Sequence, residues 1–179
     1  MIVFSNISIS PATPDDLPAI KTLLDSAYRG KDSKKGWTTE AHLIAGDERT
    51  TLEELEELIQ KEGTVFLVYR YNNTIAACVN LQKTGERIYL GMLSVSPQLQ
   101  GKGIGKEMLM AAEEYAKQVK GISIYMTVIS VRYELIEWYK RFGYTDTGER
   151  KAFKEDGRSG RHLQPLAFMV MEKKMVRFQ

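Results

Sequence analysis

A glycine-rich turn is the part of the sequence whose residue types and spacing most directly suggest chemistry. Residues 93–106 read LSVSPQLQGKGIGK, which is an apolar stretch, a turn with glycine at alternate positions, and the start of an amphipathic helix. Glycine lets the backbone approach a ligand without a Cβ atom. The unpaired amides of a helix N-terminus also carry partial positive charge. We therefore expect this turn to bind an anion such as a pyrophosphate.

Two common phosphate-binding loops do not fit this spacing. A P-loop needs Gly, four residues, and then Gly-Lys-Ser/Thr, but Gln100 stands at the first position and Glu107 at the last. A dinucleotide-binding loop, G-x-G-x-x-G, opens the first βαβ unit of a sheet. Here the third glycine comes one residue early, and the turn follows the third or fourth predicted strand. The sequence excludes the first loop and argues against the second.

The pattern Gln100-x-x-Gly103-x-Gly105 resembles the acetyl-CoA loop of the GCN5-related N-acetyltransferases (GNAT), which is Q/R-x-x-G-x-G/A at a strand-to-helix turn. A second segment, residues 137–144 (EWYKRFGY), resembles another motif of the family. That motif consists, in order, of an aromatic or aliphatic residue, Tyr, two or three mostly polar residues, and Gly followed by Phe or Tyr. The two motifs lie in the family's order, with room for one helix and one strand between them. A motif gains weight when its context agrees. The alternative is a tight turn whose glycines serve packing alone.

This resemblance implies acetyl-CoA as the cofactor. In the family, main-chain amides of the loop surround the pyrophosphate, and the strand before it pairs with the pantetheine arm. A backbone amide near the end of that strand, at Leu93 or Ser94, polarises the thioester carbonyl. The cofactor-binding residues implied for this chain are Leu93, Ser94, Val95, Gln100, Gly101, Lys102, Gly103, Ile104, Gly105 and Lys106.

The resemblance also implies that Tyr139 is the general acid that protonates the departing CoA sulfur. A phenol, with a reference pKa of about 10, stays protonated at neutral pH, as a proton donor must. The alternative role is that of a core aromatic residue, because Tyr139 is in register with Leu135 and Phe142 on a predicted helix.

Several residues are candidates for the general base. A lysine-like amine has a reference pKa of about 10.4, so a nearby proton acceptor or a chain of waters would help to deprotonate it. Some family members have a carboxylate on the strand before the loop, where this chain has Tyr89. Glu40 ranks first because residues 37–40 (WTTE) lie between the first two predicted helices, in the segment that lines the acceptor site in the family. His42 and Glu134 remain candidates.

The acceptor is expected to be a primary amine of a small molecule, an amino acid or a peptide. Trp37 beside Glu40 would suit a cationic amine, whereas Arg49 could equally hold a substrate carboxylate. With His42, these are the predicted substrate-binding residues, although Trp37 could simply fill the core. Arg132 stands where many members have Asn, and could pair with a cofactor phosphate or with the acidic helix on the acceptor side.

Periodicity and capping patterns predict the elements that position these residues. Helices begin after Thr13 and Thr51, and Asn72-Asn73 joins the first pair in a meander of three strands. Ser130 is expected to cap the last helix, which Gly143 ends. The predicted strands cover residues 7–10, 64–71, 74–83, 87–95, 122–128, 144–153 and 164–173. This order matches the GNAT fold, an α/β (α+β) domain over residues 1–179 with a mixed, largely antiparallel central sheet of about seven strands flanked by about four helices.

Composition limits the partners. The 179 residues include 25 Lys+Arg and 23 Asp+Glu, giving a net charge of +2, so electrostatics give no reason to expect nucleic acid. The single cysteine, Cys78, lies in an apolar run and is expected to be a buried hydrophobe rather than an acyl carrier. No window approaches the ~20 apolar residues of a membrane span.

Together these observations predict a cytoplasmic, acetyl-CoA-dependent N-acetyltransferase in which the amine attacks directly in a ternary complex. We expect a monomer or homodimer with no metal, nucleic-acid or membrane partner. The alternative is a noncatalytic module of the same fold that binds or senses acyl-CoA.

Overall fold

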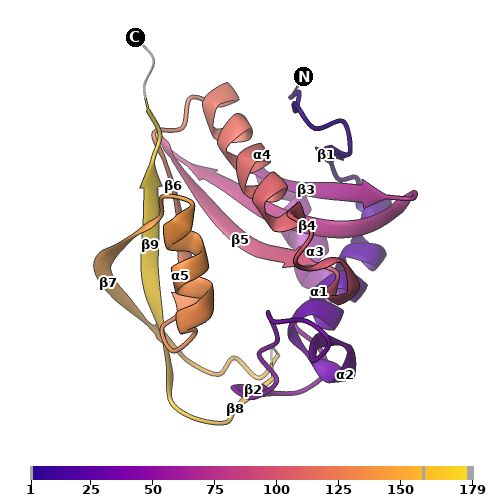
Figure 1. Ribbon diagram of the computed structural model, residues 1–179, viewed down its shortest axis with the longest axis vertical. Helices are drawn as coiled ribbons and strands as arrows, with labels where there is room; N and C mark the ends of the chain where they lie inside the picture. The colour runs from indigo at the N-terminus through magenta and orange to yellow at the C-terminus, as the bar shows by residue number, and fades with distance from the viewer. Residues whose placement is uncertain (1, 159, 177–179) are drawn as a thin grey trace.

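The centre of the fold is a mixed sheet, seen in a computed structural model that describes residues 2–158 and 160–176 (Figure 1). The seven strands lie in the order β1-β3-β4-β5-β6-β9-β7, and only β5 and β6 run parallel. The bounds are β1 Ile9–Pro11, β3 Thr64–Tyr71, β4 Thr74–Thr84, β5 Arg87–Val95, β6 Ser123–Ile129, β7 Thr145–Phe153 and β9 Leu166–Lys174. The predicted largely antiparallel sheet of about seven strands is confirmed.

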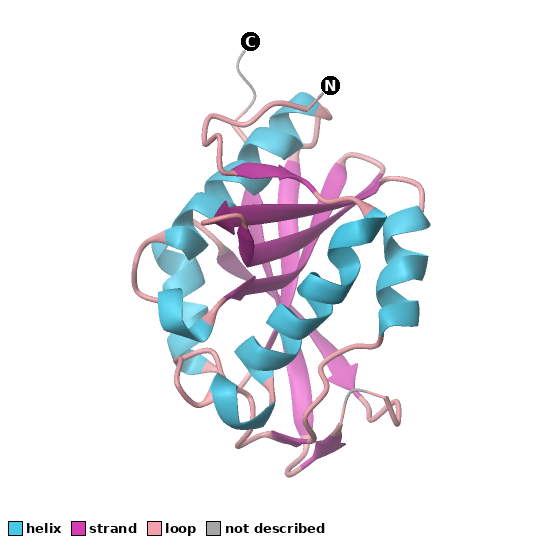
Figure 2. Ribbon diagram, turned by 90° about the vertical axis from the view of Figure 1, so that its right-hand side faces the viewer, coloured by secondary structure: helices cyan, strands magenta, loops and turns pink. Residues whose placement is uncertain are grey.

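Helices cover both faces of this sheet (Figure 2). Because side chains alternate along a strand, β3 sends Phe66 and Val68 toward α1 and α3, and Leu67 toward α4 and α5. The helices are α1 Leu17–Tyr28, α2 Gly30–Ser33, α3 Leu52–Gln60, α4 Ile104–Gln118 and α5 Tyr133–Arg141. The sequence predicted four of these, and the four-residue α2 adds a fifth.

Turn and cap residues end several elements as predicted, with one exception. Asn72 and Asn73 have φ angles of 49° and 60°, as a two-residue hairpin turn between β3 and β4 requires. The hydroxyl of Thr51 accepts a hydrogen bond from the amide of Glu54 at 3.2 Å, which caps α3. The prediction that Ser130 caps α5 is wrong, because the helix begins after Arg132 without a side-chain cap.

The sheet opens between β5 and β6. These strands pair only over residues 87–89 and 123–125. Beyond this point the register of β5 against β4 shifts, and Met92 takes a φ of 54°. Such a bulge bends a strand and ends its pairing on one side. The second half of β5 therefore presents its edge to the space beside β6.

A second, two-stranded sheet closes the lower end of the molecule in Figure 1 and was not predicted. It pairs β2 (Ile44–Ala45) with β8 (Arg161–His162) in antiparallel register. The pairing joins the segment after α2 to the loop before β9. None of the described helices is both long and apolar enough to cross a membrane.

Candidate functional site

Two cavities meet at the opening between β5 and β6. The large cavity, of about 990 Å³, lies between the glycine turn and α5. The small cavity, of about 220 Å³, lies between the end of α1 and the diverging strands. Both are lined by Tyr28, Leu93, Leu135 and Tyr139. A molecule in one cavity can therefore meet a molecule in the other beside these four residues.

The glycine turn forms one wall of the large cavity. Among the described residues, no hydrogen-bond partner exists for any backbone amide from Gly101 to Lys106. Gly101 and Gly103 have φ angles of 79° and 85°, which other residues adopt only with strain, and a Cβ atom at either would meet no atom within 4 Å. Unpaired amides at the start of a helix such as α4 suit an anionic group.

Most of the predicted cofactor residues share this cavity. Ser94 and Lys102 line neither cavity: Ser94 is buried and its hydroxyl donates to the carbonyl of Met92 at 3.3 Å, while Lys102 is exposed. The predicted residues that line the large cavity are Leu93, Val95, Gln100, Gly101, Gly103, Ile104, Gly105 and Lys106.

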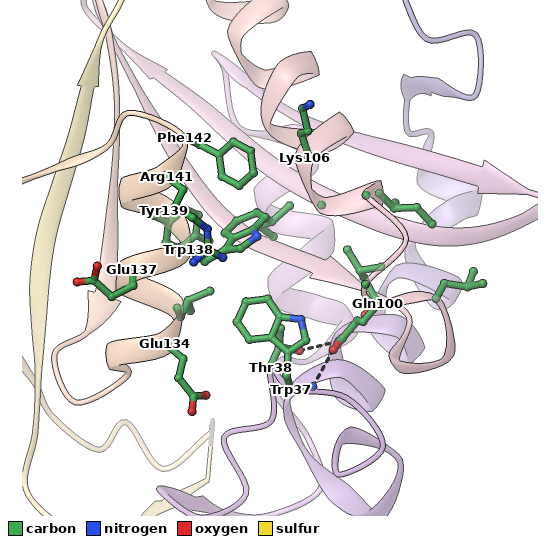
Figure 3. Close-up of a pocket in the computed structure, with 18 of the residues that line it drawn as sticks. Trp37, Thr38, Gln100, Lys106, Glu134, Glu137, Trp138, Tyr139, Arg141 and Phe142 are labelled. Carbon is green, nitrogen blue, oxygen red and sulfur yellow. Dashed lines mark hydrogen bonds between the residues drawn. The ribbon is translucent and has the colours of Figure 1, made fainter.

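The side chain of Gln100 links the glycine turn to the facing segment. Its Oε1 accepts from the amide of Trp37 at 2.9 Å, and its Nε2 donates to Oγ1 of Thr38 at 2.8 Å and to the carbonyl of Val95 at 3.1 Å (Figure 3). A Cβ atom on Gly36 would lie 2.5 Å from that Oε1 atom, so a larger residue there would displace the end of the Gln100 side chain. The Gln100 side-chain amide is thus hydrogen-bonded within the protein, and the unpaired groups of the turn are its backbone amides.

Aromatic rings line the large cavity. The ring centroids of Trp37 and Trp138 are 6.1 Å apart, and Trp138 also contacts Tyr139 and Phe142 at 5.1 and 4.8 Å (Figure 3). Trp37 was predicted to stand beside Glu40 on the acceptor side. The structure separates the two: Trp37 lines the large cavity and Glu40 the small one.

Tyr139 is placed on α5 where the two cavities meet. Its side chain is 6% exposed, and its hydroxyl has no hydrogen-bond partner among the residues that the structure describes. Burial raises the pKa of Tyr139 well above the ordinary value of 10, and the neighbouring Tyr28 and Tyr144 act in the same direction. The phenol is therefore protonated and able to donate to a ligand.

A buried carboxylate bound by two arginines lies in the small cavity. Nη1 of Arg29 donates to Oε2 of Glu40, and Nη1 of Arg132 donates to Oε1 at 3.2 Å. The three residues are 1%, 7% and 8% exposed in the order Arg29, Glu40, Arg132. Burial by itself would raise the pKa of Glu40, but the charges of Arg49, Arg132 and Arg29 hold it below the ordinary value of 4.5. Glu40 is thus a carboxylate anion.

Arg132 therefore takes neither of the two roles considered for it. Besides its bond to Glu40, its Nη2 donates to the carbonyl of Thr38 at 2.9 Å. Its partners lie in the segment after α2 and not on the acidic helix α3 or on the glycine turn. Arg132 thus holds the start of α5 to the segment that separates the two cavities.

Arg49 and Tyr28 complete this wall of the small cavity. The guanidinium of Arg49 lies 5.7 Å from the centroid of the Tyr28 ring and makes no ion pair or hydrogen bond with any described residue. The Tyr28 hydroxyl donates to the carbonyl of Leu93. Sequence analysis identified Arg49 but missed Tyr28 and Arg29. Tyr28 continues the apolar stripe of α1, which could have identified it, whereas nothing local distinguishes Arg29 from a surface arginine.

The remaining predicted residues lie at the edges of the site. His42 is exposed and lines neither cavity, and Glu134 is exposed at the rim of the large one. Tyr89 lines the small cavity, with its hydroxyl 3.3 Å from Oγ1 of Thr127. Over residues 2–158 and 160–176, no three His, Cys, Asp or Glu side chains gather as a metal site would require.

Comparisons with known proteins agree with this geometry. The sequence model of the acetyltransferase (GNAT) family matches residues 19–144. Among the curated proteins compared, none matches the sequence. Similar solved structures include the ribosomal-protein-S18-alanine N-acetyltransferase of Escherichia coli, at TM-score 0.70 and 15% identity over 96% of this chain and 95% of that one.

Two further structures are similar over nearly their whole length. The ribosomal-protein-alanine N-acetyltransferase of Brucella melitensis has a TM-score of 0.68 and 19% identity, covering 93% of this chain and 99% of its own. The PaiA N-acetyltransferase of Thermoplasma acidophilum, solved in complex with coenzyme A, has a TM-score of 0.65 and 18% identity over 93% and 98% of the two chains. At such identities these structures show the fold alone.

Proposed function

The chain belongs to the acetyltransferase (GNAT) family, and on this premise we propose that it transfers an acetyl group from acetyl-CoA to a primary amine. The observation that supports this most directly is the row of unpaired amides from Gly101 to Lys106, on a cavity that extends to Tyr139. These amides would bind the diphosphate of CoA. The edge of β5 at residues 93–95, which β6 does not pair, would lie along the pantetheine arm.

Amine acetylation requires a place for the acyl donor, a place for the amine, and a proton donor for the departing sulfur, and each corresponds to a part of this site. The donor occupies the large cavity, the amine enters the small one, and the two meet beside Tyr139. As the amine nitrogen bonds to the acetyl carbon, the carbon–sulfur bond breaks and the sulfur takes up the Tyr139 proton, while the amine proton leaves to water and the Tyr139 phenolate then regains a proton from water. We propose this direct attack in a ternary complex because both cavities are open to the same tyrosine.

Glu40 fits a positioning role better than the role of general base for which it ranked first. A base must accept a proton, but the charges of three arginines hold the pKa of this carboxylate below its usual range. Both of its oxygens are also engaged, by Arg29 and Arg132. We propose that Glu40 holds these two arginines in place and that water receives the amine proton.

The proposal is tested by a thermal-shift screen followed by an activity assay. Coenzyme A and acetyl-CoA should raise the melting temperature, because a ligand that binds only the folded state stabilises it, whereas ATP and NAD should not. Release of free thiol from acetyl-CoA should then depend on added amine. Stabilisation by ATP or NAD in place of CoA would overturn the proposal. Tight CoA binding with no amine-dependent thiol release would instead identify a noncatalytic acyl-CoA module.

A further inference from the structure

The small cavity contains more positive than negative charge. Arg29, Arg49 and Arg132 all line it, and Glu40 is the sole acidic residue among its described lining residues. Three guanidinium groups thus share one carboxylate. The remaining lining residues are neutral and largely apolar, so they supply no second counter-charge.

This charge is not distributed evenly among the three arginines. Arg29 and Arg132 both bond to Glu40, one to each carboxylate oxygen. The guanidinium of Arg49 lies over the face of Tyr28, at 5.7 Å from the ring centroid, and makes no ion pair or hydrogen bond with the described residues. Arg49 therefore has its hydrogen-bond donors available for an anion that enters the cavity.

We propose that the acceptor amine carries a carboxylate, as a free amino acid does, and that Arg49 binds this carboxylate while the amine faces Tyr139. The inference rests on the proposed acetyltransferase function and specifies its substrate class. A guanidinium presents paired donors that match the two oxygens of a carboxylate. Arg132, beside Glu40 on the same cavity, adds a second positive charge to the anion's surroundings.

The same cavity disfavours the other acceptor classes left open by the sequence. A polyamine or other multiply charged cation would meet like charges, and such juxtapositions oppose binding. The N-terminus of a peptide has a neutral amide where a free amino acid has its carboxylate, so it would leave Arg49 unpaired. The volume of about 220 Å³ also suits a small molecule.

Matched acceptor pairs test this directly. The kcat/KM for thiol release should be measured with alanine, β-alanine and 4-aminobutyrate, and with the corresponding amides. At least one acid should be preferred over its amide by about tenfold or more, since a site built to bind a polar group rejects the analogue that lacks it. For alanine, amine reactivity cannot explain such a preference, because the amine of the amide is the weaker base and more of it is neutral at a given pH.

Variants at Arg49 connect the preference to this residue. Arg49→Gln should lower kcat/KM for the preferred acid by about tenfold or more. The ratio of kcat/KM for the acid to kcat/KM for its amide should then approach one. Arg49→Lys should retain part of the preference, because it keeps the charge but loses the paired donors. Arg150→Gln is the matched control, since Arg150 is exposed on β7 and, among the described residues, its side chain bonds to nearby Asp146 and to the carbonyl of Glu149. It should keep the wild-type ratio.

A binding measurement separates the failure of this inference from that of the proposed function. With CoA saturating, N-acetylalanine and N-acetyl-β-alanine should raise the melting temperature more than their amides do, and Arg49→Gln should remove the difference. Turnover of amides or diamines equal to that of the acids would overturn the carboxylate preference and leave the acetyltransferase function intact. CoA binding without turnover, but with the product carboxylates still selected, would overturn the function and retain the anion site. Equal shifts from acids and amides would refute the anion site.

Discussion

Nη1 of Arg132 lies 3.2 Å from Oε1 of Glu40, although 92 residues separate the two in the sequence. The contact joins the start of α5, which bears Tyr139, to the segment after α2 that separates the cavities. Arg29 at the end of α1 binds the other oxygen of the same carboxylate. One buried anion thus holds together three parts of the wall of the small cavity.

Removing this anion should destabilise the fold. Glu40→Gln would remove the carboxylate that Arg29 and Arg132 both bind at a buried position, and breaking a buried ion pair in this way costs about 3 to 5 kcal/mol. A fall in melting temperature of roughly 2 to 4 °C for each kcal/mol is expected for a chain of this size. Arg70→Gln, which breaks the more exposed ion pair with Asp16, is the comparison and should cost much less.

The same substitution predicts a pH dependence with a definite sign. The pKa of Glu40 is lowered in the folded state, so its contribution to stability is complete above the ordinary value of 4.5 and is lost as the pH falls through the folded pKa. The difference in unfolding free energy between wild type and Glu40→Gln should be largest at neutral pH and should shrink below about pH 4.5. Denaturant titrations between pH 3 and 7 measure it. A difference that is constant over this range would contradict the ion-pair account.

Tyr139→Phe should lower kcat by roughly 100-fold or more while leaving the binding of CoA unchanged, because it removes the proton but keeps the ring. Tyr144→Phe is a matched control: Tyr144 is fully buried, its ring centroid is 5.8 Å from that of Tyr139, and its hydroxyl has no described partner. Removal of the Tyr144 hydroxyl should leave kcat near the wild-type value.

The alkaline behaviour of the wild type gives an independent check on this acid. Because burial raises the pKa of Tyr139 well above 10, no loss of kcat from its ionisation should occur below pH 10. A wild-type profile that falls in the range of an ordinary exposed phenol, and that Tyr139→Phe abolishes, would contradict the buried environment described here.

Gly103→Ala should weaken the binding of acetyl-CoA by about tenfold, because φ near 85° is strained for alanine by about 1 to 2 kcal/mol and relief of that strain reorients the amides. Gly148→Ala is closely matched, with the same φ of 85° and no atom within 4 Å of the added Cβ. Calorimetric titration with CoA measures both variants. Gly148 lies on β7, away from the cavities, so Gly148→Ala should affect stability alone.

Cys78 should be unreactive in the folded protein. The side chain is fully buried in β4, and burial raises the pKa of its thiol to about 12. Since the thiolate is the reactive form, alkylating reagents should modify Cys78 only after unfolding. Cys78→Ala should retain acetyl transfer. Rapid modification under native conditions, or loss of turnover in Cys78→Ala with CoA binding preserved, would revive a covalent acyl-thiol step.

Local chemistry explains which features could be predicted from the sequence. The Thr51 cap and the Asn72-Asn73 turn depend on residues a few positions apart, and both occur as expected. The glycine turn is similarly local: its φ angles and unpaired amides follow from Gly101 and Gly103 standing between a strand and a helix.

Features that depend on contacts between residues far apart in the sequence could not be predicted from local patterns. The strands β2 and β8 have two residues each, too few to show a periodic pattern, and they exist only because the chain brings them together. Trp37 faces the large cavity because Gln100 holds its amide, a contact between positions far apart in the sequence. The buried bond between Arg29 and Glu40 likewise joins residues 11 positions apart, and no local sequence pattern around either residue predicts it.

Among the residues that the structure describes, only four line both cavities, and this division has an evolutionary consequence. The large cavity is lined mainly by β5, the glycine turn, α4 and α5, with Tyr28, Trp37 and Thr38 facing them, whereas the charged residues of the small cavity are 29, 40, 49 and 132. If the proposed roles hold, substitutions at Arg49 therefore change which amines are accepted and leave the binding of the acyl donor unchanged, because Arg49 lines the small cavity alone. A lineage of such chains could diversify its metabolic repertoire one side chain at a time.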